Sequence, residues 1–102
     1  MSIKNIAKVR RFIDALEGSN DFIILLALKK TKEATIKDIQ IEIAANLRDM
    51  IYPSSVKHRL MKFIEQGLVE EANGKFKLTE RGKELARIVE EFVKMLEEKM
   101  LT

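Results

Sequence analysis

Side chains that can bind anions and bases gather in the segment after Pro53, the single proline of the chain. At 100° per residue, the apolar residues of this segment share one side of a helix and the polar residues are left on the other. The polar side and its edges carry Ser54, Ser55, Lys57, His58, Met61 and Lys62. Apart from Met61, these side chains are short hydroxyls and long donors. Serine hydroxyls and backbone N–H groups at a helix start bond phosphate oxygens, which indicates a helix that binds phosphate.

The positions of the basic residues along this helix predict different contacts. Lys57 and His58 lie in the first turns, where a helix inserted end-on into the major groove of DNA meets base edges. Arg59 and Lys62 are better placed for the flanking phosphates. We therefore predict a duplex-DNA interface. An ordinary solvated face is the alternative for this helix taken alone.

A short hairpin after the helix supports the same prediction. Asn73-Gly74, between two short alternating runs, is the strongest local signal for a two-residue turn. The alternation directs three apolar residues toward the core: Val69, Phe76 and Leu78. A ribbon that carries Asn73, Lys75 and Lys77 on its outer side can contact the DNA backbone or enter a minor groove. Covering the edge of the core is the alternative role.

Caps and apolar periodicity predict the elements that position these groups. The polar helix spans residues 54–66 and ends at Gly67, which can adopt a positive φ at little cost. Thr35 and Asp38 form a Thr-x-x-Asp capping signal for the preceding helix. The inward stripe of that helix is Ile36, Ile39, Ile43 and Leu47.

The segment 22–28 is continuously apolar, so periodicity alone cannot separate a buried strand from a buried helix. A cap at Ser19 or Asn20 and the basic pair at residues 29–30 favour a helix. We expect this helix to be the central element of the core.

The last predicted helix, over residues 80–100, is capped by Thr79 and has an apolar stripe longer than a domain of this size must cover. Its main members are three or four residues apart: Leu85, Val89, Phe92, Leu96 and Met100. Such stripes pair helices across dimer interfaces, so we predict a homodimer here. Packing against a first helix over residues 2–17 is the alternative.

Composition excludes several classes of protein. A chain of 102 residues with 46% apolar and 34% charged residues is one globular domain, 1–102. With no Cys and a single His, neither a zinc site nor a nucleophile–histidine pair is visible, so we predict no enzyme, no metal and no cofactor. Nothing marks a pocket for a small-molecule ligand. The abundance of Lys, Glu and Ile, together with the absence of Cys, favours a thermophilic source.

The chain lacks an 18-residue apolar run and a signal-peptide core at its start, which predicts no membrane contact and a cytoplasmic location. The net charge of +3 is unevenly distributed. Residues 53–83 hold seven basic and four acidic groups, giving +3, whereas residues 84–102 hold three and five, giving −2. The positive charge thus lies on the predicted DNA-binding unit, and the last helix would not be drawn to phosphate.

Five local segments carry a resemblance to a known family: 25–28 (LLAL), 35–39 (TIKDI), 53–60 (PSSVKHRL), 65–69 (EQGLV) and 78–85 (LTERGKEL). Together with the order of the elements, they resemble winged helix-turn-helix regulators, particularly MarR-like and PadR-like ones, over about residues 20–90. The resemblance implies a mainly α fold with a small β-hairpin. It divides the chain into an N-terminal helix (1–17), a winged helix-turn-helix core (20–83) and an extended C-terminal dimerisation helix (80–100).

The resemblance also implies a function: sequence-specific binding of duplex DNA by a homodimeric transcriptional regulator. The helix 54–66 would lie in the major groove and the wing 68–79 on the flanking backbone. The residues that match DNA-reading positions are Ser54, Ser55, Lys57, His58 and Lys62, and those on the wing are Asn73, Lys75 and Lys77. Winged helices also serve as protein-interaction modules in larger assemblies, which is the alternative function.

Overall fold

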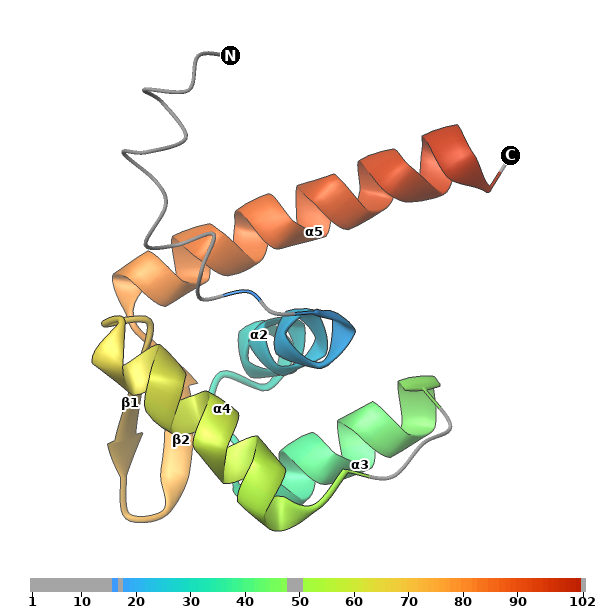
Figure 1. The fold of residues 1–102 in the computed structure, drawn as a ribbon. Helices are drawn as coiled ribbons and strands as arrows, with labels where there is room; N and C mark the ends of the chain where they lie inside the picture. Colours follow the sequence, from blue (N-terminus) through green and yellow to red (C-terminus); the bar gives the residue numbers. More distant parts are fainter. Residues whose placement is uncertain (1–15, 17, 48–50, 102) are drawn as a thin grey trace.

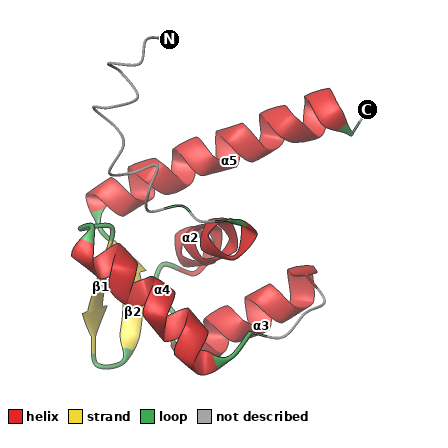
Figure 2. Ribbon diagram, in the orientation of Figure 1, coloured by secondary structure: helices red, strands yellow, loops and turns green. Residues whose placement is uncertain are grey.

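The computed structural model describes residues 16, 18–47 and 51–101. Within these ranges it contains four helices and one antiparallel hairpin of two strands (Figures 1 and 2). The elements are α2 (Ser19–Thr31), α3 (Ile36–Leu47), α4 (Pro53–Glu65), β1 (Val69–Ala72), β2 (Lys75–Leu78) and α5 (Glu80–Met100). This confirms the predicted fold class, a mainly α winged-helix fold with a long last helix. Apart from Leu16, the predicted helix over residues 2–17 lies outside the described residues.

The central helix is α2, with α5 on one side and α3 and α4 on the other (Figure 1). Its apolar run confirms the predicted buried helix, since Ile24, Leu25 and Leu28 are fully or almost fully buried. The predicted cap at Ser19 or Asn20 is wrong. The helix already begins at Ser19, because the Phe22 N–H donates to the Gly18 carbonyl (3.2 Å), and no side chain within the described residues caps it.

The predicted capping box of α3 is confirmed. The Thr35 N–H donates to Asp38 Oδ2 (3.0 Å), and the Asp38 N–H donates to Thr35 Oγ1 (3.2 Å). The hydrogen bond from the Thr35 N–H, and after it the Thr35 hydroxyl, lower the pKa of the Asp38 carboxyl, because both favour its charged form. Ile39 and Ile43 are buried as predicted, while Ile41 lies off the stripe and is exposed.

Helix α4 has the predicted packing face, and it begins and ends one residue earlier than predicted, at Pro53 and Glu65. Pro53 lies in its first turn, and Val56, Leu60 and Phe63 are completely buried. After the helix the chain turns through Gly67, whose φ of +74° favours glycine. The Leu68 N–H then donates to the Phe63 carbonyl (2.9 Å), which joins the end of α4 to the hairpin.

The hairpin turns at Asn73 and Gly74, with φ values of +54° and +78°, the two positive angles of a type I′ turn. As predicted, Val69, Phe76 and Leu78 are buried and the two lysines of β2 are exposed. One partner of the hairpin was not predicted. Ala34, in the loop before α3, exchanges two backbone hydrogen bonds with Phe76 (2.9 and 2.8 Å).

Helix α5 begins at the predicted cap, where Thr79 Oγ1 accepts from the Gly82 N–H (3.1 Å). The backbone passes so close to the hairpin here that a Cβ on Gly82 would lie 1.9 Å from the Leu68 carbonyl oxygen. The first half of α5 packs into the core through Leu85, Ala86 and Val89. Its second half extends beyond α2 (Figure 1).

Candidate nucleic-acid interface

The first two turns of α4 form an exposed polar surface. Ser54, Ser55, Lys57 and His58 are all exposed, while the opposite side of the helix is buried in the core. The first turn has no acidic residue, and no side chain within the described residues caps it. The positive end of the helix dipole is therefore left without a compensating charge, which favours an anion at this end.

A shallow hollow of about 230 Å³ follows one flank of this helix. Its lining consists of Ser54, Ser55, His58, Arg59 and Lys62. Every one of these side chains can donate a hydrogen bond. The hollow therefore suits a phosphate oxygen or the edge of a base.

Arg59 and Lys62 line the hollow, yet their charged ends turn to a buried carboxylate. Arg59 donates to Asp21 Oδ1 (2.6 Å) and Lys62 donates to Asp21 Oδ2 (3.1 Å). The Asp21 side chain is completely buried, and only 28% of the Arg59 side chain and 20% of the Lys62 side chain are exposed. The structure thus separates these two cations from Lys57 and His58, although all four were predicted to contact DNA.

The wing carries its predicted residues on the surface, but its charges are nearly balanced. Lys75 Nζ lies 3.5 Å from Glu33 Oε1, and Lys77 Nζ lies 3.4 Å from Glu70 Oε1. All four side chains are 55% exposed, so these ion pairs are weak and can exchange for other partners. Asn73 is exposed at the turn.

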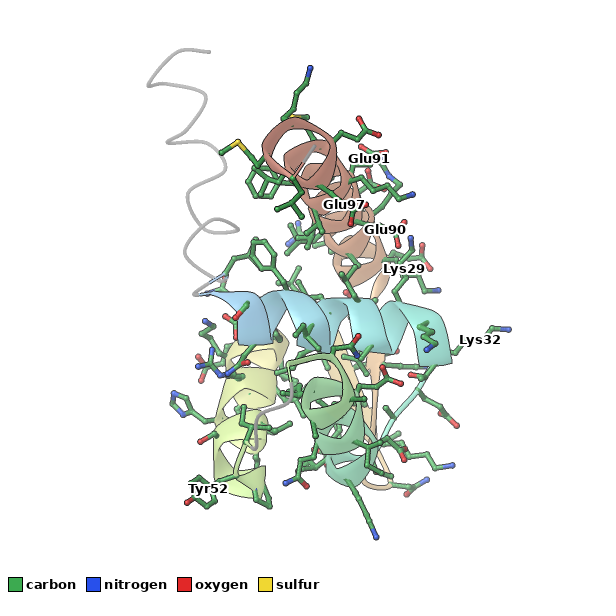
Figure 3. The ribbon with its side chains drawn as sticks, turned by 90° about the vertical axis from the view of Figure 1, so that its right-hand side faces the viewer. Lys29, Lys32, Tyr52, Glu90, Glu91 and Glu97 are labelled. Atoms are coloured by element: carbon green, nitrogen blue, oxygen red, sulfur yellow. The ribbon has the colours of Figure 1, made fainter. Side chains whose placement is uncertain are left out.

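Two candidate residues were not predicted from the sequence. Tyr52, at the N-cap of α4, is 78% exposed and points away from the body of the molecule (Figure 3). The only tyrosine of the chain, directly before its only proline, was a signal that could have identified it. Asp21 had no such signal, because its partners Arg59 and Lys62 are 38 and 41 residues away in the sequence.

The predicted dimer residues fall into two groups. Leu85 and Val89 belong to the core of the chain itself. Phe92, Leu96 and Met100 are 46%, 42% and 73% exposed, and they continue the stripe along the projecting half of α5. Ile88 and Met95 are also exposed and widen this apolar surface.

Within the described residues, no helix is long and apolar enough to span a membrane. In the same part of the chain, no three His, Cys, Asp or Glu side chains are grouped to hold a metal ion.

A helix with an exposed polar start, next to a hairpin and below a long last helix, defines a winged-helix domain. The family described as "Methanogenesis regulatory protein FilR1, N-terminal domain" has a sequence model that matches residues 22–97. The chain belongs to this family, whose named member is a regulatory protein. The match does not point to MarR-like or PadR-like regulators in particular. No curated protein and no solved structure matches the chain.

Proposed function

We propose that this protein is a transcriptional regulator that binds duplex DNA through the first half of α4. The observation that carries the proposal is the exposed, uncapped start of α4 with its hydroxyls, Lys57 and His58. The family supports it, because its named member is a regulatory protein.

In the proposed complex, the start of α4 enters the major groove. Lys57 and His58 face base edges, and Ser54 and Ser55 bond the phosphates beside the helix N-terminus. Tyr52 lies next to them and adds a phenol hydroxyl. The DNA backbone beside the groove contacts the wing at Asn73, Lys75 and Lys77. The two lysines contribute to affinity only when they leave their glutamate partners and pair with phosphates.

The proposed active form is a homodimer through the projecting half of α5. Phe92, Leu96 and Met100 are covered by the same residues of a second copy across a two-fold axis. Such a dimer places two copies of α4 roughly one turn of DNA apart, about 34 Å. The DNA site is accordingly an inverted repeat.

The test of function is selection of bound duplexes from a random pool. We expect an enriched inverted repeat, and an affinity for random duplex that falls steeply with salt because lysines release counterions from phosphate. Replacing Lys57 and His58 together with Ala should weaken binding to the enriched site more than binding to random duplex. Lys94→Ala, which removes a charge from α5, is the matched control. Affinity that does not change with salt would refute DNA binding.

The test of the dimer is the molar mass in solution. Leu96→Glu with Met100→Glu should convert a dimer into a monomer by light scattering, since each introduces a charge into an apolar contact. Lys94→Glu places the same side chain close to Glu90, on the polar side of α5, and should leave the mass unchanged. A double variant that keeps the mass of the unaltered chain would exclude this interface.

The second candidate function is that of a protein-interaction module. Ile41 and Tyr52, 57% and 78% exposed, leave large apolar surface near the start of α4, which suits a protein partner. This candidate predicts no enrichment from the random pool and little salt dependence. The same selection experiment therefore separates the two functions.

A further inference from the structure

Asp21 is the one buried charged residue among the described residues, and it connects α2 to the DNA-binding helix. It lies in the first turn of α2, and both of its carboxylate oxygens accept from cations of α4. Arg59 and Lys62 are three residues apart and therefore lie one above the other on the flank of α4 that faces Asp21. Among the described residues, the cluster joins two cations to one anion.

Burial makes this pairing persistent. A carboxylate removed from water is stable only with partners that compensate its charge, so the two cations cannot leave Asp21 together without a large cost. Lys62 is further held by the Phe63 ring, whose centroid lies 5.7 Å from Nζ. The exposed pairs of the wing lack this constraint, because water replaces either partner.

The two flanks of α4 therefore offer different charges to an approaching polyanion. Lys57 is exposed and forms no ion pair with the other described residues, whereas Arg59 and Lys62 would have to abandon a buried carboxylate to reach a phosphate. Phosphate contacts by lysine and arginine supply affinity for any duplex, and base contacts supply the discrimination between duplexes.

We infer that Asp21 is a specificity-determining residue, which withholds the charges of Arg59 and Lys62 from the phosphate backbone. By this device the first half of α4 contacts DNA with hydroxyls, His58 and a single lysine, and sequence-independent affinity stays low. Asp21 acts through its two partners and does not touch DNA. The inference rests on the proposed function, because it assigns a role to the same helix.

The direct test is Asp21→Asn, assayed by binding to random duplex over a range of salt concentrations. Loss of the carboxylate charge releases up to two cations toward phosphate, and each new contact steepens the slope of log K against log salt by about 0.9. We expect a slope steeper by about 1 to 2, and binding to random duplex roughly 3- to 10-fold tighter near physiological salt. Binding to the enriched site should gain less, so the ratio of specific to random affinity should fall. An unchanged or shallower slope in a folded variant would overturn the inference.

A matched pair of variants tests the inference with Asp21 in place. Lys57→Gln and Lys62→Gln make the same change on the same helix, five residues apart. On random duplex, where Lys57 has no matching base and falls on a phosphate instead, Lys57→Gln should make the slope shallower by about 0.9, while Lys62→Gln should change it by less than about 0.3. Equal losses would show that Lys62 contacts phosphate and would overturn the inference. This pair decides the question even if Asp21→Asn fails to fold, and circular dichroism confirms that both variants are folded.

The failure of the inference can be told from the failure of the proposed function. If the unaltered chain shows no salt-dependent affinity for duplex DNA, both are overturned. If it binds with a steep salt dependence but Lys57→Gln and Lys62→Gln behave alike, only the role of Asp21 is overturned.

Discussion

The two halves of α5 carry one continuous apolar stripe but lie in different surroundings. In the first half, Leu85 and Val89 are 8% and 3% exposed and complete the core. In the second half, Leu96 and Met100 are 42% and 73% exposed, although they continue the same spacing. Apolar periodicity thus identifies which side of a helix avoids water, but it does not identify what covers that side.

The change occurs where α5 crosses α2. Phe92 meets the Phe22 ring edge-on, with centroids 6.4 Å apart, and Lys29 Nζ donates to Glu90 Oε1 (2.9 Å). Figure 3 shows Lys29 on α2 below Glu90 on α5. Beyond these contacts the helix extends past α2, and its apolar side chains are largely exposed.

The largest expected effect on stability comes from a substitution at the start of the first, buried half of α5. Gly82→Ala places a methyl group 1.9 Å from the Leu68 carbonyl oxygen, which belongs to the backbone and cannot move aside alone. We expect a loss of roughly 3 kcal/mol or more in the free energy of unfolding, measured by urea denaturation. Lys83→Ala, at the next and exposed position, should cost less than about 0.5 kcal/mol. Similar stability of both variants would mean that α5 does not approach the hairpin closely.

The comparison of the two halves is tested by one substitution made in each. Leu85→Ala should cost about 2–4 kcal/mol, because it leaves a cavity in the core. Leu96→Ala should cost less than about 1 kcal/mol at low protein concentration, where its side chain is already in water. At high concentration its cost should rise if the second half is covered by another copy. Equal costs at low concentration would contradict the difference between the halves.

A smaller effect is expected at the cap of α5. Thr79 Oγ1 donates to the Gly67 carbonyl (2.6 Å) and accepts from the Gly82 N–H. Thr79→Val removes both bonds at constant shape and should cost about 1–2 kcal/mol in denaturant unfolding. Thr79→Ser keeps the hydroxyl and should recover most of the loss. If the serine variant were as unstable as the valine variant, the hydroxyl bonds would not be the cause.

The smallest effect concerns the ion pair where the two halves meet. The hydrogen bond from Lys29, and then its charge, lower the pKa of Glu90 below its ordinary value of 4.5. A lowered pKa in the folded state stabilises the protein above the unfolded value, and this contribution is lost as the pH falls through the folded value. Glu90→Gln should therefore lower the melting temperature slightly at neutral pH, and its effect should shrink as the pH falls below 4.5. A double-mutant cycle with Lys29→Gln checks that the pair is responsible.

The features that could be predicted from the sequence depend on residues close together in the chain. The Thr35–Asp38 capping box, the Asn73–Gly74 turn and the exit at Gly67 each follow from the stereochemistry of a few neighbouring residues. The exposed serines and Lys57 followed from helical periodicity, because the opposite side of α4 was clearly apolar.

The features that could not be predicted depend on residues distant in the chain. Asp21 looked like an ordinary acidic residue at a helix start, and only the packing of α2 against α4 brings it to Arg59 and Lys62. Likewise, the pairing of Ala34 with Phe76 requires the loop before α3 to lie beside β2. Patterns of neighbouring residues do not indicate which of the several basic side chains on a helix will pair with a buried carboxylate.

The hydrogen bonds at the base of the wing have a mechanical consequence. The Thr79 N–H donates to the Leu68 carbonyl, and the Thr79 hydroxyl donates to the Gly67 carbonyl. These two hydrogen bonds join the beginning and the end of the hairpin. One end of the hairpin follows α4 and the other leads into α5. The hydrogen bonds of Thr79 therefore couple the orientations of these two helices. A change in the direction of α5 relative to the hairpin would therefore also change the direction of α4.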